Sequence, residues 1–343
     1  MPVTNHETFH VPTPRVETAA VEIGLNAAIV AVQNDEPVVL AVKDTPDTVG
    51  ASDGLPFGPF SPVSHRTLDI GLRSWVTDQT GLELGYVEQL YTFGDRGRHA
   101  QPDDTRPHIM SIGYLALTQA SEIEGGESGY WRSWYQFFPW EDWRKGRPEI
   151  LEAVIEPELM KWANQTPYNQ NPFRLPDRAQ RARLCFGFDG GTWDEEKVLE
   201  RYELLYEAGL VAEAHRDRPE RFTNTPAVFR RTGLAMRYDH RRILATAIGR
   251  VRAKIKYRPV VFELMPGEFT LFELQKTVEA ILGPHLHKQN FRRLVESAGL
   301  VEPTGEMKTR TGGRPAKLFR FRRDVLLERP APGVRVKAVA TRN

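Results

Sequence analysis

The stretch FTLFELQKTVEAILGPHLHKQNFRRLVESAGLVEPTGEMKTRTGGRPAKLFRF, residues 269–321, decides the fold of the C-terminal part of the chain. Thr270 followed by Glu273 forms a capping box, which predicts that a helix begins at Leu271. Apolar side chains then recur on one helical face up to a Gly-Pro pair at 283–284, where the helix is expected to end.

A second helix is predicted from about Lys288 to Ala298, with Gly299 as its stop. Its polar face carries side chains that can bind base edges and phosphates: Lys288, Gln289, Asn290, Arg292 and Arg293. A basic turn and a strand over 316–321 follow, and their cations, expected to track the DNA backbone, are Lys308, Arg310, Arg314 and Lys317. Helix, short turn, donor-rich helix and basic hairpin are together typical of a winged helix-turn-helix.

The distribution of charge favours a nucleic-acid partner for this segment. Residues 236–323 hold 19 Lys and Arg against 8 Asp and Glu, whereas the whole chain has a net charge of only +1. Positive charge concentrated at one end is typical of a protein that binds a polyanion there. A solvated basic surface on an ordinary helical module is the alternative, and donors on both the helix and the turn favour DNA over it.

Composition indicates a soluble protein of a reducing compartment. The 343 residues allow two or three domains, and 40% hydrophobic and 27% charged residues are ordinary values. The single cysteine, Cys185, excludes an internal disulfide and a cysteine zinc site, and the histidines show no metal-ligand spacing. The N-terminus lacks the apolar core of a signal peptide, and no run of about 18 apolar residues occurs. We therefore expect a cytoplasmic protein without a bound metal.

The N-terminal part predicts a small mixed α/β domain. Strands are expected at 21–32, 37–42, 85–93 and 108–118, and a helix from about Thr67 to Thr80 with Gly81 as its stop. The expected fold class is thus an α/β domain, extended in the middle of the chain, followed by a C-terminal winged helix-turn-helix.

Residues 55–82 resemble a Nudix box that has lost its ligands. In a working box several glutamates bind magnesium, because a hard divalent cation needs several carboxylate oxygens. With Gly81 as the anchor, Arg66 stands at the first glutamate position. Ser74-Trp75 and Asp78-Gln79 stand where Arg-Glu and Glu-Glu are usual, so only Asp78 remains as a ligand. We therefore expect no catalytic residue here.

A more specific motif is VEQLYTFGDRGRH, residues 87–99. With the Nudix-like helix and the motifs NFRRLVESAGLVEPTG (290–305) and GGRPAKLFRF (312–321), it resembles the Nudix-related transcriptional regulators of NAD metabolism. The resemblance covers about residues 21–118 and 236–323. It implies a dimeric repressor of NAD biosynthesis or salvage genes that requires no cofactor and senses an adenine nucleotide: ADP-ribose, NAD or ATP.

The same resemblance implies that the effector lies in the former catalytic groove. The residues expected there are Phe57, Gly58, Arg73, Asp78, Phe93, Arg96 and Arg98. Arg96 and Arg98 suit a pyrophosphate, and the aromatic rings suit a base or ribose. For each residue taken alone, loop solubility or core packing is an equally open explanation.

The middle of the chain departs from the usual plan of this family. Four tryptophans fall within residues 131–143, which fits a stacking platform for adenine or, with more weight, a packed aromatic seam. The elaborated middle is similar to the NadQ-type branch, which represses de novo NAD synthesis. Residues 164–183 are expected to be irregular, while Thr192 and Glu195 predict a helix from Asp194 to Ala208.

The predicted organisation has four parts: a flexible arm (1–19), a degenerate Nudix-like sensor domain with the aromatic-rich extension (20–235), a winged helix-turn-helix (236–325) and a mobile tail (326–343). A long helix that begins after Asp239 is expected to connect the two domains or to form a dimer contact. Two alternatives remain open. One is a magnesium-dependent Nudix pyrophosphohydrolase of ADP-ribose with a DNA-binding tail, and the other is a non-specific architectural DNA-binding protein.

Overall fold

The computed structural model describes residues 20–43, 53–95, 107–120, 129–165, 176–222, 231–309, 315–328 and 333–334. Four predicted site residues, Arg96, Arg98, Arg310 and Arg314, lie outside these ranges, as do the predicted arm and most of the predicted tail. Within the described ranges, no helix is both long and apolar enough to cross a membrane.

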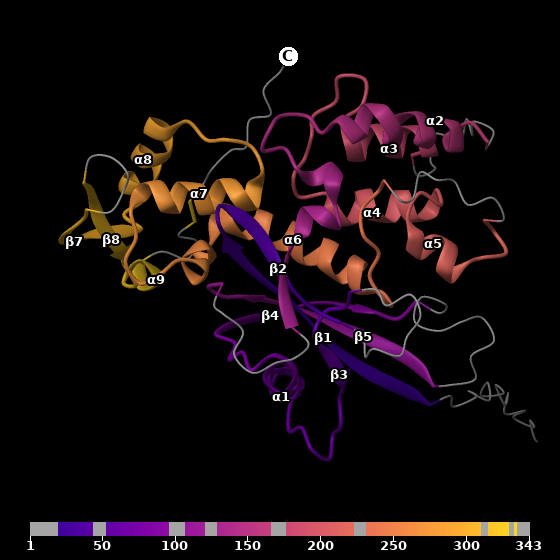
Figure 1. Ribbon diagram of the computed structural model, residues 1–343, viewed down its shortest axis with the longest axis horizontal. Coiled ribbons are helices and arrows are strands. Elements are labelled where there is room, and N and C mark those ends of the chain that lie inside the picture. Colours follow the sequence, from indigo (N-terminus) through magenta and orange to yellow (C-terminus); the bar gives the residue numbers. More distant parts are fainter. Residues whose placement is uncertain are drawn as a thin grey trace, which may run out of the picture.

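A mixed sheet forms the N-terminal part of the molecule (Figure 1). Its strands are β1 (Val21–Gln33), β2 (Glu36–Val42), β3 (Phe57–Pro59), β4 (Tyr86–Phe93), β5 (His108–Leu117) and β6 (Gly129–Ser133). They lie in the order β4-β5-β1-β2-β6, with β3 paired to β1. β1 and β5 run parallel, and the other pairs run antiparallel. The four strands predicted from the sequence are therefore present, and the mixed α/β class is confirmed.

The first hairpin follows from its turn residues. Gln33 and Glu36 pair across the turn, so Asn34 and Asp35 form a two-residue loop. Their φ angles are 53° and 60°. Positive φ at both positions is the type I′ turn, whose twist matches that of the flanking strands, and Asn and Asp tolerate this conformation better than other side chains.

A helix covers each face of the sheet. α1 (Leu68–Thr80) packs on one face and α6 (His240–Tyr257) on the other (Figure 1). Alternate residues of β1 supply both cores, because successive side chains of a strand point to opposite faces. Ala27 and Ile29 belong to the core beneath α1, while Ala28 and Val30 belong to the core beneath α6.

A helical layer lies beside α6 (Figure 1). Its elements are the short helices η1 (Trp134–Gln136), η2 (Pro139–Glu141) and η3 (Leu151–Ile155), then α2 (Glu156–Ala163), α3 (Arg178–Phe186), α4 (Val198–Glu207) and α5 (Ala212–Asp217). α3 begins inside the segment predicted to be irregular, because Asp177 and Gln180 form a capping box. α4 begins later than predicted, since Glu195 pairs with Lys256 at 2.5 Å instead of capping a helix.

The Trp-rich segment is a packed seam. Trp134, Phe137, Phe138 and Trp140 are each 0% exposed. The rings of Phe138 and Trp140 meet edge to face with their centroids 5.7 Å apart. These four rings are enclosed by the protein, so they hold the helical layer together and are not open to stack on a bound base.

The C-terminal part is a winged helix-turn-helix. Its elements are η5 (Val260–Leu264), α7 (Leu271–Leu282), α8 (Lys288–Ser297), β7 (Val301–Lys308), β8 (Ala316–Phe321) and α9 (Val325–Glu328). Phe269 and Phe319 exchange two backbone hydrogen bonds of 2.9 and 2.8 Å, which adds a minimal third strand to the β7-β8 hairpin. The capping box of Thr270 and Glu273 is present, and the predicted order of helix, turn, helix and hairpin is confirmed.

α6 joins the two parts. It contacts β1, β4 and β5 of the sheet, α4 of the helical layer and α7 of the winged helix. One hydrophobic core runs from the sheet through α6 to α7. The predicted boundary between residues 235 and 236 therefore separates segments that share a core.

Candidate DNA-binding interface and sensor site

α8 presents the predicted donors to the outside of the molecule. Phe291 (3% exposed) and Val295 (0% exposed) turn inward. The exposed side chains of this helix include Lys288, Gln289, Asn290, Arg292 and Arg293. Within the described part of the chain, none of these five takes part in an ion pair or a hydrogen bond with the protein. Their donors are therefore available to a ligand.

Glu279 fixes the turn that leads into α8. The backbone N–H of Leu286 donates to its carboxylate at 2.9 Å, and the amide of Gln275 donates to the same carboxylate and to the carbonyl of Leu286, both at 2.8 Å. Burial alone raises the pKa of Glu279, but the hydrogen bonds from Leu286, Gln275 and His285 outweigh it and hold the pKa below its usual value. The ionised carboxylate thus ties the turn to α7.

A small surface pocket brings three predicted cations together. Its volume is about 120 Å³, and it is lined by Thr270, Leu271, Phe272, Gln275, Lys288, Arg292, Ala316 and Lys317. Lys288 and Arg292 come from α8 and Lys317 from β8, while Phe272 is 54% exposed. Three cations around one depression suit an anion such as a phosphodiester.

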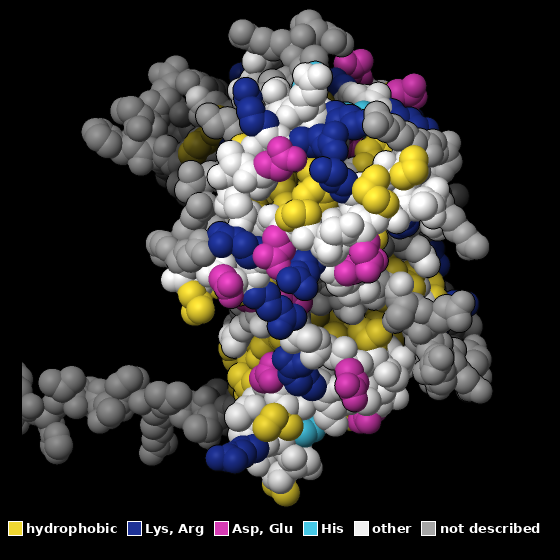
Figure 2. Space-filling model, turned by 90° about the vertical axis from the view of Figure 1, so that its left-hand side faces the viewer, with side chains coloured by type: hydrophobic (Ala, Val, Ile, Leu, Met, Phe, Trp, Pro, Cys, Tyr) yellow, Lys and Arg dark blue, Asp and Glu magenta, His cyan; other side chains and the backbone are white. Residues whose placement is uncertain are grey.

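The wider surface around this pocket is basic but interrupted. Figure 2 looks onto the side of the molecule that carries α8 and β8. Lys and Arg side chains recur down this face, and Asp and Glu side chains separate them. Such a surface favours defined points of phosphate contact over a uniform electrostatic stripe.

Lys308 is engaged within the protein. Its ammonium pairs with Glu273, which forms the capping box of α7 with Thr270. Burial opposes ionisation of Glu273, but hydrogen bonds from Lys308 and Thr270 outweigh it, so the pKa of that carboxyl lies below its usual value. Lys308 therefore braces the wing against α7, and its predicted contact with DNA stays a prediction.

In the segment that resembles a Nudix box, two side chains form hydrogen bonds with strand β3. The indole Nε1 of Trp75 donates to the carbonyl of Pro59 at 2.9 Å. The amide of Gln79 donates to the carbonyl of Phe57 at 2.6 Å and accepts from the N–H of Phe57 at 3.1 Å. The sequence motif places these two residues at glutamate positions of a Nudix box, and both fasten β3 to α1. No group of three or more His, Cys, Asp or Glu side chains capable of holding a metal occurs among the described residues.

The remaining candidates on α1 are also engaged. Arg73 pairs with Asp69 at 2.9 Å and donates to the carbonyls of Leu84 and Gly85. Asp78 accepts a long hydrogen bond of 3.5 Å from Ser74. A ligand that bound Arg73 would therefore have to displace these partners, whereas Asp78 is exposed.

Phe57 lies at the junction of the sensor sheet and α6. Its ring centroid is 5.7 Å from that of Tyr238 and 5.2 Å from that of His240, and the guanidinium of Arg237 lies 4.6 Å from its centre. The N–H of Leu55 donates to Nδ1 of His240 at 2.9 Å. The loop before β3 is thus in direct contact with the start of α6.

The effector candidates that the structure describes are spread over both faces of the sheet. Gly58 faces Trp75, since a Cβ at residue 58 would lie 2.2 Å from the indole. Phe93 is 1% exposed and packs beneath Arg242 of α6, on the opposite side of the sheet from α1. Among the described candidates, Phe57 and Gly58 lie side by side on β3. Tyr238, which was not among the predicted effector residues, contacts Phe57 and has a φ of +50° at the entrance to α6.

The described arrangement defines a class of protein: a Nudix-like α/β domain joined through a shared core to a winged helix-turn-helix. Residues 261–321 match the family model of the NrtR DNA-binding winged helix domain. The winged helix is therefore of the NrtR kind, and the chain as a whole resembles NrtR in its fold.

Two known proteins are similar to this chain, one over a short segment of sequence and the other over most of the fold. The chain is 43% identical over 88 residues to the ADPR responsive transcriptional repressor NtrR of Acinetobacter baylyi, a match that covers 26% of this chain and 35% of that protein. The matched segment thus spans about a third of the repressor's length. The crystal structure of Shewanella oneidensis NrtR with a 27mer DNA covers 88% of this chain and 94% of its own, at 19% identity and a TM-score of 0.52. A second crystal structure of Shewanella oneidensis NrtR covers 88% of this chain and 95% of its own, at 18% identity and a TM-score of 0.52.

Proposed function

We propose that the protein is a DNA-binding transcriptional repressor of NAD biosynthesis genes, controlled by an adenine nucleotide in a catalytically inactive Nudix-like domain. The observation that carries the proposal is the row of unpaired donors on α8, within a winged helix of the NrtR kind. The protein acts as a homodimer, whose two recognition helices read half-sites about one helical turn apart. The NadQ-type branch remains the predicted subgroup.

On DNA, α8 reads bases and the pocket beside it holds the backbone. Gln289 and Asn290 are able to make bidentate contacts with adenine, and Arg292 and Arg293 with guanine. Lys288, Arg292 and Lys317 surround a depression of phosphate size. Arg310 and Arg314 are proposed to extend this backbone contact from the wing.

ADP-ribose is the effector that we propose first. The Acinetobacter relative is described as ADPR responsive. In this chain, Phe57 sits against Tyr238 and His240, so a nucleotide bound near β3 acts on the start of α6. The lost carboxylates at Trp75 and Gln79 argue against magnesium-dependent cleavage of that nucleotide, since their side chains are occupied by β3.

Two substitutions test the DNA-binding role on the full chain. Asn290→Ala is expected to weaken binding to an NAD-biosynthesis promoter by about 1–3 kcal/mol, with little change on scrambled DNA. Lys317→Ala is expected to weaken both DNAs alike and to reduce the salt slope by about one unit. Lys161→Ala, a change of the same charge on α2 at a side chain that is 72% exposed, is the control. Equal losses on both DNAs for Asn290→Ala would exclude its base-reading role.

A further inference from the structure

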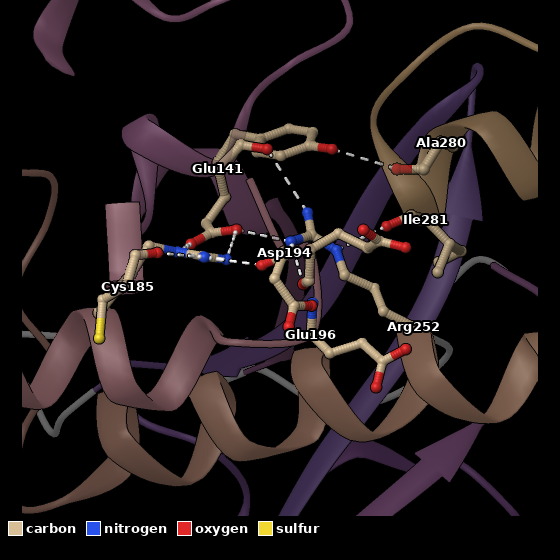
Figure 3. A network of polar contacts seen from close by, with 10 residues as sticks. Glu141, Cys185, Asp194, Glu196, Arg252, Ala280 and Ile281 are labelled. Carbon is tan, nitrogen blue, oxygen red and sulfur yellow. Dashed lines mark hydrogen bonds and ion pairs between the residues drawn. The ribbon is translucent and has the colours of Figure 1, made fainter. Parts of the chain in front are cut away.

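A buried ionic network lies between the helical layer and the winged helix (Figure 3). Glu141 of η2 is 0% exposed. It accepts hydrogen bonds from Arg201 of α4 at 2.6 and 3.0 Å and from Arg252 of α6 at 2.5 Å. Both guanidinium groups are as enclosed as the carboxylate, with side chains 0% and 1% exposed. Three segments distant in sequence thus meet at one carboxylate.

The network continues into the last turn of α7. Nε of Arg252 donates to the carbonyl of Ile281 at 2.9 Å, and the hydroxyl of Tyr135 donates to the carbonyl of Ala280 at 3.2 Å. The last carbonyls of a helix have no partner within the helix, so side chains that reach them fix its end. Figure 3 shows Arg252 and the aromatic hydroxyl directed at these two carbonyls, Ala280 and Ile281.

The contact lies immediately before the turn that leads to α8. Gly283 has a φ of +97°, and a Cβ there would lie 3.4 Å from that of Trp143. The end of the Trp-rich segment therefore packs directly on this turn. α8 begins at Lys288, so the last turn of α7 sets where the recognition helix starts.

We propose that Tyr135 and Arg252 are positioning residues for the recognition helix α8. They hold the end of α7 against the helical layer, which makes the Trp-rich segment part of the DNA-binding machinery. This inference rests on the proposed function. A tilt of α7 by about 10° would move a point about 15 Å away by about 2.6 Å, more than a hydrogen bond to a base tolerates.

The hydrogen bond of Arg252 with Ile281 also links α8 to the N-terminal domain, which is the proposed sensor. His240 at the start of α6 accepts the hydrogen bond from Leu55, and Arg252 lies further along the same helix. At a rise of about 1.5 Å per residue, the two residues are about 18 Å apart along the helix axis. One rigid helix therefore connects the loop before β3 to the end of α7.

Tyr135→Phe is the discriminating variant, because it removes one hydroxyl and keeps the buried ring. Tyr206→Phe is the matched control: Tyr206 is also buried, and its hydroxyl donates to Asp217 at 3.0 Å, away from α7. Operator affinity is measured by fluorescence anisotropy, and backbone exposure by hydrogen-deuterium exchange over residues 283–291. We expect Tyr135→Phe to weaken operator binding about five-fold and to accelerate exchange in this segment. Tyr206→Phe should do neither.

Arg252→Lys is a second variant that keeps the positive charge beside Glu141 but lacks the planar guanidinium group with its several N–H donors. It should affect operator binding and exchange more strongly than Tyr135→Phe. If Tyr135→Phe differs from Tyr206→Phe in neither readout, the positioning role is refuted. If the wild-type chain shows no operator preference, the proposed function fails. The exchange data then decide the positioning role alone: faster exchange in Tyr135→Phe supports it, and unchanged exchange overturns it.

Discussion

Glu141→Gln should be among the most destabilising conservative changes in this protein. The substitution keeps the shape of the side chain and removes the only carboxylate that contacts both Arg201 and Arg252 among the described residues. Both guanidinium groups are at most 1% exposed, so water cannot replace the lost charge. Removing one partner of a buried ion pair costs about 3–5 kcal/mol, because the other charge stays buried without compensation.

The expected shift in melting temperature follows from the size of the chain. An unfolding entropy of about 2.1 cal/mol/K per residue, taken over 343 residues, gives about 0.7 kcal/mol/K. A loss of about 3–5 kcal/mol therefore lowers Tm by about 4–7 °C. Differential scanning calorimetry of the full chain measures this shift directly.

The winged helix offers a control with the same contact distance. Arg320 and Glu302 also pair at 2.6 Å from Nε to a carboxylate oxygen, but their side chains are 62% and 38% exposed. An exposed pair contributes at most about 1 kcal/mol, so Glu302→Gln should lower Tm by no more than about 1.4 °C. If Glu141→Gln and Glu302→Gln shift Tm equally, burial does not govern the energy of this network and the reasoning is refuted.

Two further predictions concern the Nudix box and the turn before α8. Gln79→Glu replaces the donor to the carbonyl of Phe57 with an anionic oxygen, so thermal denaturation should show a loss of about 1–3 kcal/mol. Chromatography should still detect no magnesium-dependent release of AMP from ADP-ribose, and its appearance would contradict an inactive box. Because the pKa of Glu279 is lowered on folding, its stabilising effect is present above its ordinary value of 4.5 and is lost as the pH falls through the lower folded value. The difference in the free energy of unfolding between wild type and Glu279→Gln should therefore be largest at neutral pH and should disappear in acid. A difference that does not depend on pH would exclude this role.

Capping boxes at the start of helices and glycines at their ends were the local sequence patterns that predicted helix boundaries correctly. The helix beginning at Leu271 followed from Thr270 and Glu273, and the helix ending at Thr80 followed from Gly81. The same rule failed at Thr192 and Glu195, because Glu195 is drawn to Lys256 of α6. A local pattern cannot register a partner that only the tertiary fold supplies.

The two candidate sites also differed in how well the sequence predicted them. The donor face of α8 was predictable because helical spacing separates it from Phe291 and Val295. The effector residues were predicted from the resemblance to a family, and the structure distributes those that it describes over both faces of the sheet. The contact of Gln79 with Phe57 and the junction of Phe57 with His240 depend on packing between distant segments. No periodicity in the sequence carries that information.

Two side chains of the predicted Nudix box connect a strand to a helix. Trp75 and Gln79, which stand at predicted glutamate positions of that box, fasten β3 to α1. β3 carries Phe57, which in turn contacts the start of α6. A nucleotide that displaced or tightened this strand would thus act on the helix that reaches α7, at a coupling energy of about 1.4 kcal/mol for each ten-fold change in operator affinity.

The most direct test of the proposed function is fluorescence anisotropy of the full chain on DNA from an NAD-biosynthesis promoter. Salt is fixed, scrambled DNA is the control, and ADP-ribose, NAD and ATP are added in turn. We predict specific binding that ADP-ribose shifts without being consumed. Equal affinity for promoter and scrambled DNA, or hydrolysis of the added nucleotide, would contradict a nucleotide-controlled repressor.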